Sequence, residues 1–308
     1  MNTPANAPSC SALLLLATET PLHAGTGQST GGIDLPIQRE AHTRWPCVFG
    51  SAVKGALRAH AAGRLAGGDL VNLFGPDHGG MQGIDESHAG ALLVGDAVLL
   101  ALPARSLQSH FKWVSCPAAL TRLARALARL GLPPLPALPS GLEIGEDEAL
   151  TGHAKDKDVF LEELRFTSRH ATFIGELAQA LADMSGGGLQ ADALKNQFVI
   201  VHDDAFAFIT QNATPVHTHV ALDSATKTVK PGALWTEETL PPETLLYVPV
   251  TATASRKRGA SVTAQQALKQ LTGLFPAEGN WLQLGGNETT GMGWCRVGVH
   301  ADKSIGQA

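Results

Sequence analysis

The chain has 308 residues, of which 44% are hydrophobic and 17% are charged, and this composition excludes an intrinsically disordered protein. The early apolar run at residues 12–17 is too short to span a bilayer, and no Lys or Arg precedes it as in a secretory signal. We therefore expect a cytoplasmic protein without membrane contact. The four cysteines show no Cys-x-x-Cys spacing, which argues against a disulfide framework or a thiolate zinc site.

The charge is unevenly distributed along the chain. The total of 23 basic against 28 acidic residues argues weakly against a protein coated in nucleic acid, because phosphate binding needs Lys and Arg. However, no acidic residue lies between Asp96 and Glu143, and a second basic group occupies residues 256–258. The sequence therefore leaves room for a basic face.

The first elements are a strand, a loop and a helix. Residues 11–19 are short and apolar and predict a buried strand, and the four glycines within residues 25–32 predict an irregular connection. Ser51 is expected to cap a helix over roughly residues 52–66. On that helix Lys54 and Arg58 lie one turn apart, so two cations share a face.

The middle of the chain alternates apolar segments with loops. We expect one strand within residues 90–101, or two strands that break at Gly95-Asp96, and a further strand at 111–114. A helix should run from Pro117 to a stop at Gly131. A loop or insertion over 132–157 and a helix near 173–184 should follow. The arginines at 122, 125 and 129 then form one helix face, which we interpret as solvated.

The last part of the chain returns to β-type residues. Residues 198–209 and 216–222 predict strands of a hairpin-bearing lobe. Further elements are expected as a strand near 245–250, a helix near 263–274 and strands at 281–284 and 294–299. This order is typical of an α+β protein with one or two ferredoxin-like units.

The region that combines residues 23–40 and 50–58 is rich in glycine and indicates phosphate binding. In residues 23–40 and 50–58, glycines allow backbone amides to approach an anion, and the predicted helix N-terminus adds positive charge. Neither the P-loop pattern nor a Rossmann fingerprint is met. The second loop, residues 285–293, lies between two predicted strands, so a tight hairpin is an equally good interpretation.

These stretches together carry a specific resemblance. The strings at residues 21–27, 32–40, 50–58 and 285–293 resemble the RAMP superfamily of CRISPR proteins, and within it the backbone subunits of type III-B (Cmr) effector complexes. The resemblance covers nearly the whole chain and is weakest over residues 132–157 and 173–197.

The resemblance implies a fold and partners. It implies a single RAMP domain over residues 1–308, with an RRM-like (ferredoxin-like) palm at about 10–130 and 240–300. A helical fingers insertion and a β-hairpin thumb would occupy about 20–50 and 132–235. Several copies would stack along a CRISPR RNA (crRNA), together with other Cmr subunits and the target RNA.

The resemblance also implies RNA-binding residues. The guide contacts carried over are Arg39, Ser51, Lys54, Arg58, Gly285, Gly286, Gly291 and Gly293. Because only 5% of residues are aromatic, we expect recognition through phosphates and 2′-hydroxyls instead of base stacking.

Asp34 matches the catalytic aspartate of the family. RNA supplies its own 2′-OH nucleophile, so one carboxylate that holds a divalent cation, Mg²⁺ or Mn²⁺, suffices to support cutting. His23 is the expected acid or base helper, and Glu237 or Glu238 is expected to assist at a neighbouring copy. Without the resemblance, we would interpret Asp34 as a turn cap and His23 as a structural histidine.

Other interpretations stay open. The apolar residues Ile209, Val216 and Val220 are candidates for a thumb tip that splays a base pair. His217 and His219 point the same way on a strand but lack a third ligand, which favours a structural role over zinc.

A non-catalytic crRNA scaffold is the second functional hypothesis, and Asp34 argues against it. The type III-A (Csm) backbone ribonuclease is a near alternative, and a carbohydrate or nucleotide enzyme is a remote one.

Overall fold

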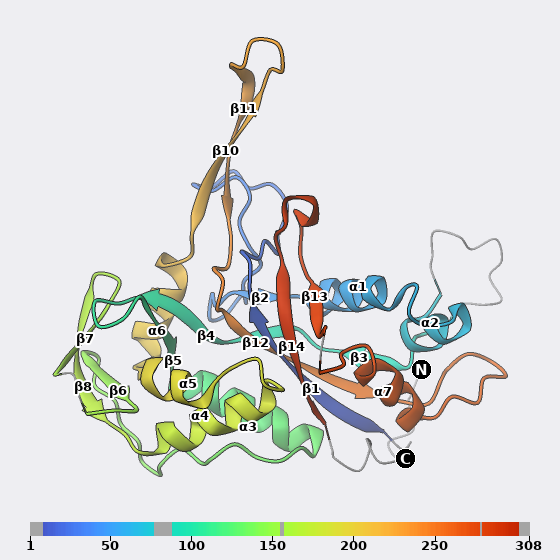
Figure 1. The fold of residues 1–308 in the computed structure, drawn as a ribbon, viewed down its shortest axis with the longest axis horizontal. Coiled ribbons are helices and arrows are strands. Elements are labelled where there is room, and N and C mark those ends of the chain that lie inside the picture. Colours follow the sequence, from blue (N-terminus) through green and yellow to red (C-terminus); the bar gives the residue numbers. More distant parts are fainter. Residues whose placement is uncertain (1–8, 77–87, 155–156, 278, 302–308) are drawn as a thin grey trace.

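A computed structural model describes residues 9–76, 88–154, 157–277 and 279–301 (Figure 1). Its largest feature is a twelve-stranded sheet with the order β13-β14-β1-β12-β4-β5-β9-β6-β8-β7, with β2 and β3 on β4 and β12. The strands are β1 (Cys10–Thr18), β2 (Cys47–Val48), β3 (Leu92–Val94), β4 (Ala97–Arg105), β5 (Phe111–Ser115), β6 (Glu148–Thr151), β7 (Asp158–Leu161), β8 (Leu164–His170), β9 (Phe198–Val201), β12 (Leu245–Ala252), β13 (Trp281–Gln283) and β14 (Trp294–Ala301).

Helices cover both faces of this sheet. They are α1 (Gly50–Ala61), α2 (Gly67–Phe74), α3 (Pro117–Leu130), α4 (Phe173–Met184), α5 (Ala191–Gln197), α6 (Asp203–Asn212) and α7 (Ala264–Thr272), with a short 3₁₀ turn, η3 (Glu288–Thr290). The chain is therefore α+β, as the order of apolar segments predicts.

Strand β1 divides the core into two layers. Its side chains alternate, so Leu14 and Leu16 pack with α1, α2 and α7, whereas Leu13 and Leu15 pack with α3 and α4. Both faces are buried, which explains why the strand reads as a continuous apolar run. The sequence prediction for this strand is confirmed.

Most other elements agree with the sequence. The strand pair breaks at Gly95-Asp96, where a Cβ on Gly95 would lie 2.8 Å from Pro249 Cγ of the adjacent strand. Helix α3 starts at Pro117 and ends where Gly131 adopts φ 67°. Helix α1 is shorter than expected, because it begins at Gly50 and ends at Ala61.

The β prediction for residues 198–209 is wrong beyond Val201. The His202 side chain accepts a hydrogen bond from the Asp204 N–H and caps helix α6. Asp203 and Asp204 lie in the first turn, where negative charge stabilises the positive end of the helix dipole. Within the apolar run that follows, Phe206 and Ile209 lie on the buried face of this helix, whereas Phe208 is exposed.

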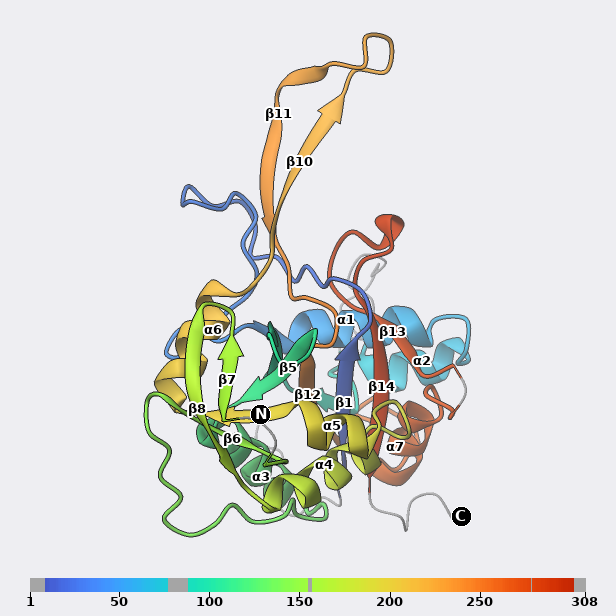
Figure 2. The ribbon, with the colours of Figure 1, turned by 60° about the vertical axis from the view of Figure 1, so that its left-hand side comes forward.

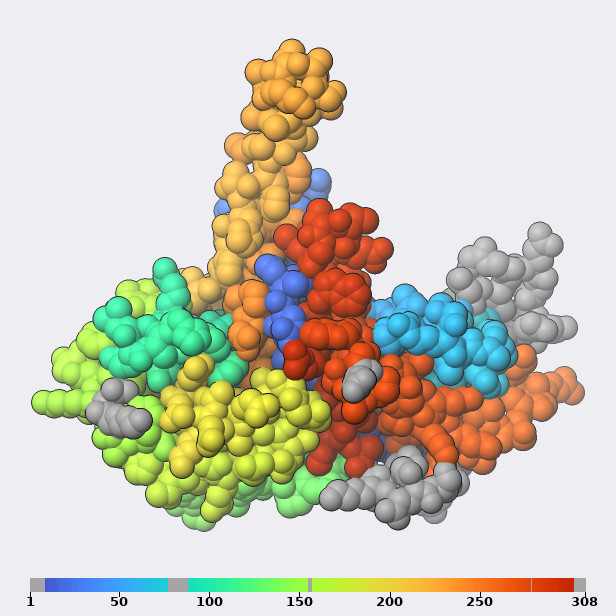
Figure 3. All heavy atoms as spheres, in the orientation of Figure 1, coloured from blue at the N-terminus to red at the C-terminus, as the bar shows by residue number. Residues whose placement is uncertain are grey.

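A β-hairpin projects from the body of the molecule (Figures 2 and 3). It consists of β10 (Val216–Leu222) and β11 (Val229–Glu238), which pair with each other in antiparallel register. The segment that follows β1 lies at the root of this hairpin, through isolated bridges Leu22–Leu240 and Leu35–Glu237. We call the β10–β11 hairpin the thumb.

None of the helices in the described ranges is long and apolar enough to cross a bilayer.

Candidate nucleic-acid interface

The segment that carries Asp34 is attached to the thumb. The Leu35 N–H donates to the Thr236 carbonyl at 3.0 Å, and the Glu238 N–H donates to the Leu35 carbonyl at 3.0 Å. Since β10 pairs with the other edge of β11, the root of β11 is held from both sides. Backbone pairing therefore places Asp34 beside strand β11, about 200 residues further along the chain.

Thr236 orients the Asp34 carboxylate. The N–H and the hydroxyl of Thr236 donate to Asp34 Oδ2 at 2.8 and 2.9 Å, and the Asp34 N–H donates to that hydroxyl at 3.0 Å. The backbone hydrogen bond first, and the side-chain one second, lower the pKa of Asp34 below its ordinary value. Asp34 is therefore an exposed, ionised and positioned carboxylate at neutral pH.

His23 binds the same strand. Its Nδ1 lies 2.8 Å from the Glu238 carbonyl, a contact in which the ring nitrogen must donate, so the Nε2 of a neutral ring is an acceptor. A Cβ on Gly25 would lie 2.6 Å from that Nε2, so glycine makes room for the ring. Strand β11 thus holds both predicted catalytic side chains, at positions two residues apart.

Glu238 is the buried centre of this region. It is 3% exposed, and its Oε1 accepts from Arg39 at 2.5 Å and from the Thr214 hydroxyl at 2.6 Å. Its Oε2 accepts from the Ile37 N–H at 3.0 Å. Burial alone would raise the pKa of Glu238, but the Thr214 and Arg39 hydrogen bonds outweigh it and lower the pKa. The Glu238 carboxylate is therefore ionised, and it joins the segment after β1, which carries Asp34, to the root of the thumb.

Arg39 is enclosed by acceptors of its own chain. Besides Glu238, its guanidinium donates to the carbonyls of Arg44 and Thr210 at 2.8 and 2.9 Å, and its side chain is only 9% exposed. These contacts give Arg39 a structural role at the thumb root, and its guide contact stays a prediction.

The two acidic residues of the thumb root also face inward. Glu237 is 3% exposed and accepts from Asn287 at 2.6 Å, which ties the loop at residues 285–293 to β11. Both carboxylates are thus engaged within this chain, and a role at a neighbouring copy stays a prediction.

A basic cluster lies along α1. Lys54 is half-buried, and burial first, followed by the charges of Arg256 and Arg58, lowers its pKa. Arg58 is oriented by a hydrogen bond to the Gly75 carbonyl. Among the described residues, no acidic side chain forms an ion pair with Lys54, Arg58 or Arg256, so this cluster is suited to an anion. We call these three residues the α1 cluster.

The start of α1 differs from the sequence prediction. Its N-cap is Phe49 without a side-chain cap, so Ser51 is not the cap and lies exposed inside the first turn. The Gly50 N–H already donates to Asp96 Oδ1 at 2.7 Å. The helix N-terminus is therefore partly neutralised, and the α1 cluster is the stronger anion-binding feature.

The glycines of the C-terminal loop divide into two kinds. A Cβ on Gly285 or Gly293 would lie within 2.4 Å of a backbone oxygen, and the Gly286 N–H donates to the His23 carbonyl at 2.9 Å. These positions hold the loop against the segment that carries His23. Gly291, by contrast, has φ 82° with open space beside it, so its backbone is accessible.

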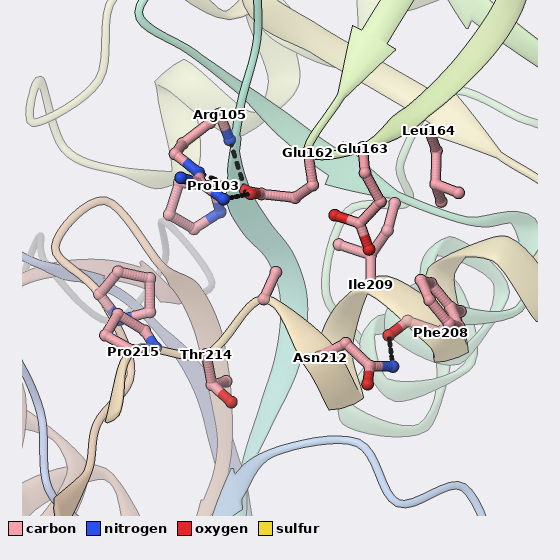
Figure 4. A pocket seen from close by; sticks show the side chains of 12 residues that line it. Pro103, Arg105, Glu162, Glu163, Leu164, Phe208, Ile209, Asn212, Thr214 and Pro215 are labelled. Atoms are coloured by element: carbon pink, nitrogen blue, oxygen red, sulfur yellow. Dashed lines mark hydrogen bonds and ion pairs between the residues drawn. The ribbon is translucent and has the colours of Figure 1, made fainter. Parts of the chain in front are cut away.

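A pocket of about 410 Å³ lies at the root of the thumb, and Figure 4 shows the side chains that line it. Its walls are mostly apolar, and Arg105 and Glu162 form an ion pair at its edge. Neither Asp34 nor His23 lines this pocket. Chemistry at Asp34 would instead take place on the open surface beside the thumb.

The thumb residues are only partly as predicted. Ile209 lies in α6 and is buried, so its assignment to the thumb tip is wrong. Val216 and Val220 lie on β10 and are exposed. His219 stacks on Trp235 with ring centroids 5.5 Å apart, and the described residues contain no group of three His, Cys, Asp or Glu side chains that could hold a metal.

The chain is similar to known CRISPR proteins over almost its full length. Residues 15–296 match the RAMP superfamily. The CRISPR system Cmr endoribonuclease Cmr4 of Pyrococcus furiosus is 30% identical over 294 residues, which cover 92% of this chain and 94% of that protein. The CRISPR system CMR subunit Cmr4 of Saccharolobus solfataricus is 24% identical over 298 residues, or 89% and 91% of the two chains.

Solved structures have the same fold. A crystal structure of oligomeric Cmr4 from Pyrococcus furiosus aligns with a TM-score of 0.72 at 26% identity, covering 95% of this chain and 98% of that one. A chain of the type III-B Cmr-β complex bound to cognate target RNA aligns with a TM-score of 0.70 at 18% identity, covering 98% and 100%. The latter likeness concerns the fold alone.

The orientation of Asp34 can be tested by titration. Thr236→Val removes the hydroxyl donor, so the pKa of Asp34 should rise toward its ordinary value, as followed by carboxyl carbon NMR. Because the hydrogen bonds favour the ionised form, they are lost as the pH falls through the pKa of Asp34. Thr218→Val, at the cross-strand partner of Thr236, is the matched control. The Thr236 N–H remains in this variant, so an unchanged pKa would show that the Thr236 hydroxyl does not orient the carboxylate.

Proposed function

The chain belongs to the RAMP superfamily, and on this premise we propose that it is the backbone subunit of a type III-B CRISPR ribonucleoprotein. Several copies would bind crRNA in the cytoplasm, beside other Cmr subunits, and would cut complementary target RNA. The support is the full-length similarity to a relative named as an endoribonuclease and to a structure named as oligomeric.

The observation that carries the nuclease proposal is the state of Asp34. An exposed carboxylate that is held by two donors on one oxygen has a defined direction and a stable negative charge. A structural turn cap would need no partner on the thumb. Positioned charge of this kind is what an RNA-cutting site requires.

The proposed reaction uses the RNA as its own nucleophile. The 2′-oxygen attacks the adjacent phosphorus, the bond to the 5′-oxygen breaks, and a cyclic phosphate and a 5′-hydroxyl result. One proton must leave the 2′-OH and one must reach the 5′-oxygen. His23 is suited to one of these transfers, because its Nδ1 is fixed on the Glu238 carbonyl and its Nε2 is an acceptor.

A divalent cation, Mg²⁺ or Mn²⁺, fits this site only together with RNA. Asp34 supplies one carboxylate, and Mg²⁺ is commonly held by one or two carboxylates plus substrate phosphates. Asp34 would hold the ion, and the ion would neutralise charge on the phosphate during attack.

The guide would lie across the palm. The strand order β14-β1-β12-β4, with α1 and α7 packed on it, supports our proposal of an RRM-like palm. The α1 cluster would contact guide phosphates. The exposed backbone at Gly291 would lie beside the same guide RNA. Such contacts read no base, which suits a guide of any sequence.

A non-catalytic crRNA scaffold is the second candidate, because binding through the α1 cluster requires no carboxylate at position 34. The backbone ribonuclease of a type III-A complex has the same chemistry and differs in its partner subunits. Cutting assays separate the scaffold from the nuclease, and co-purified subunits separate the two complex types.

Asp34→Asn tests the nuclease role. Asparagine can still accept from Thr236 but lacks the charge, so cutting of complementary RNA should fall by roughly 100-fold or more while target binding persists. The measurement is a gel assay of the assembled complex with added Mg²⁺ or Mn²⁺. Asp223→Asn, in the thumb turn, is the control. Unchanged cutting by Asp34→Asn would favour the scaffold, and cutting in excess chelator would exclude the metal.

Charge removal tests guide binding. In Lys54→Ala/Arg58→Ala, RNA affinity should drop for any guide sequence. The slope of log affinity against log salt should shrink by about 1.4, since each phosphate contact on a single strand contributes about 0.7. The control is Arg125→Ala/Arg129→Ala, which removes two exposed cations four residues apart on α3. An unchanged salt slope would show that α1 does not hold the guide.

A further inference from the structure

A groove of about 550 Å³ separates α1 from the β13–β14 hairpin, which lie side by side in Figures 1 and 2. Its lining includes Ala56, Ala59 and His60 on the helix, Trp281, Gln283 and Trp294 on the hairpin, and the oppositely charged Arg64 and Glu288. The groove belongs neither to the surface around Asp34 nor to the pocket at the thumb root.

The hairpin turns both of its tryptophans to the same face. Trp281 pairs with Arg296 and Gln283 pairs with Trp294, so these four side chains share one side of the two strands. The Arg296 guanidinium lies 5.0 Å from the Trp281 ring centroid and forms an ion pair with Glu19 at 3.0 Å. This face is therefore aromatic, and its one cation is paired.

Trp294 is an exposed aromatic on a rigid support. It is 42% exposed, whereas Trp45 and Trp113 are each 5% exposed. Its backbone N–H donates to the Thr20 hydroxyl at 3.0 Å, and its carbonyl accepts from the Glu19 N–H at 2.8 Å. A large exposed indole that is fixed in this way has a flat surface ready for stacking.

The helix between this groove and the α1 cluster presents only small residues. Ala52, Gly55, Ala56 and Ala59 follow the exposed side of α1, next to the face that carries Lys54 and Arg58. No long side chain of α1 therefore separates the cations from the groove. A strand that places phosphates on the α1 cluster can extend bases across the helix toward Trp294.

We propose that this groove binds a nucleobase of single-stranded RNA by stacking on Trp294, an inference that rests on the proposed RNA-binding function. The observations favour RNA over a protein partner, because Trp294 offers an exposed ring in the groove, Arg64 lines it together with one acidic residue, Glu288, and Lys54 and Arg58 continue the positive charge along α1. Stacking tolerates any base, since every base has a π-face. The groove therefore adds base contacts without imposing a guide sequence.

The test compares two probes on the full-length protein. One probe is a single-stranded oligoribonucleotide, and the other is inorganic polyphosphate, which carries charge but no bases. Trp294→Ala should weaken binding of the RNA between about 5-fold and 150-fold, the range for loss of one base–aromatic stack, and should leave polyphosphate binding unchanged. Trp294→Phe should retain most of the RNA affinity. Leu107→Ala, which removes an exposed apolar side chain elsewhere, should change neither.

Fluorescence supplies an independent readout. RNA should quench the emission of the wild-type protein more strongly than that of Trp294→Phe, whereas polyphosphate should not discriminate between them. Equal loss of RNA and polyphosphate binding in Trp294→Ala, or no loss of either, would overturn the base-stacking site. Loss of self-association with unchanged RNA affinity would assign the groove to a protein partner and also overturn it. Failure of the wild-type protein to bind RNA at all would overturn the proposed function itself.

Discussion

The buried carboxylate of Glu238 is the constraint on which the thumb root depends. A charge removed from water is stable only if it is fully paired, and here the three partners come from two separate segments. Arg39 and the Ile37 N–H lie in the segment after β1, and Thr214 lies where α6 turns into the thumb. The carboxylate is satisfied only when all three meet, so a single ion fixes how the loop, the helix and the hairpin are arranged.

That arrangement determines what the surface can do. Because Ile37 is held by Glu238, the preceding residues run along β11 and bring Asp34 to Thr236. The Glu238 carbonyl at the same position orients His23. Asn287 connects Glu237 to the glycine-rich loop, so this loop and the segments that carry Asp34 and His23 share one support. The proposed chemistry therefore takes place at the surface of a region whose rigidity comes from buried polar contacts.

The sequence predicts well wherever the signal is local. Strand β1, the break at Gly95 and the cap of α3 all follow from apolar runs, glycine and proline. The prediction fails where two local signals conflict. The apolar residues after Val201 indicate a strand, although His202 and the two aspartates after it begin a helix. Asp34 and Arg39 lie in one motif and look alike as site residues, and only tertiary structure separates the exposed carboxylate from the enclosed guanidinium. The low aromatic content argues against stacking, but the β13–β14 hairpin brings Trp281 and Trp294 to one groove.

The central claim is that buried pairing at Glu238 positions Asp34 for cutting, and one measurement tests it directly. Target-RNA cleavage is compared among assembled complexes that carry wild-type protein, Arg39→Met, or Arg39→Met/Glu238→Gln, with RNA binding measured in parallel. The account predicts that Arg39→Met, which leaves Glu238 buried and unpaired, reduces cutting about tenfold or more with RNA still bound, and that the double variant, which has no unpaired charge, recovers part of the rate. Wild-type cutting by Arg39→Met, or a double variant no better than the single one, would contradict it.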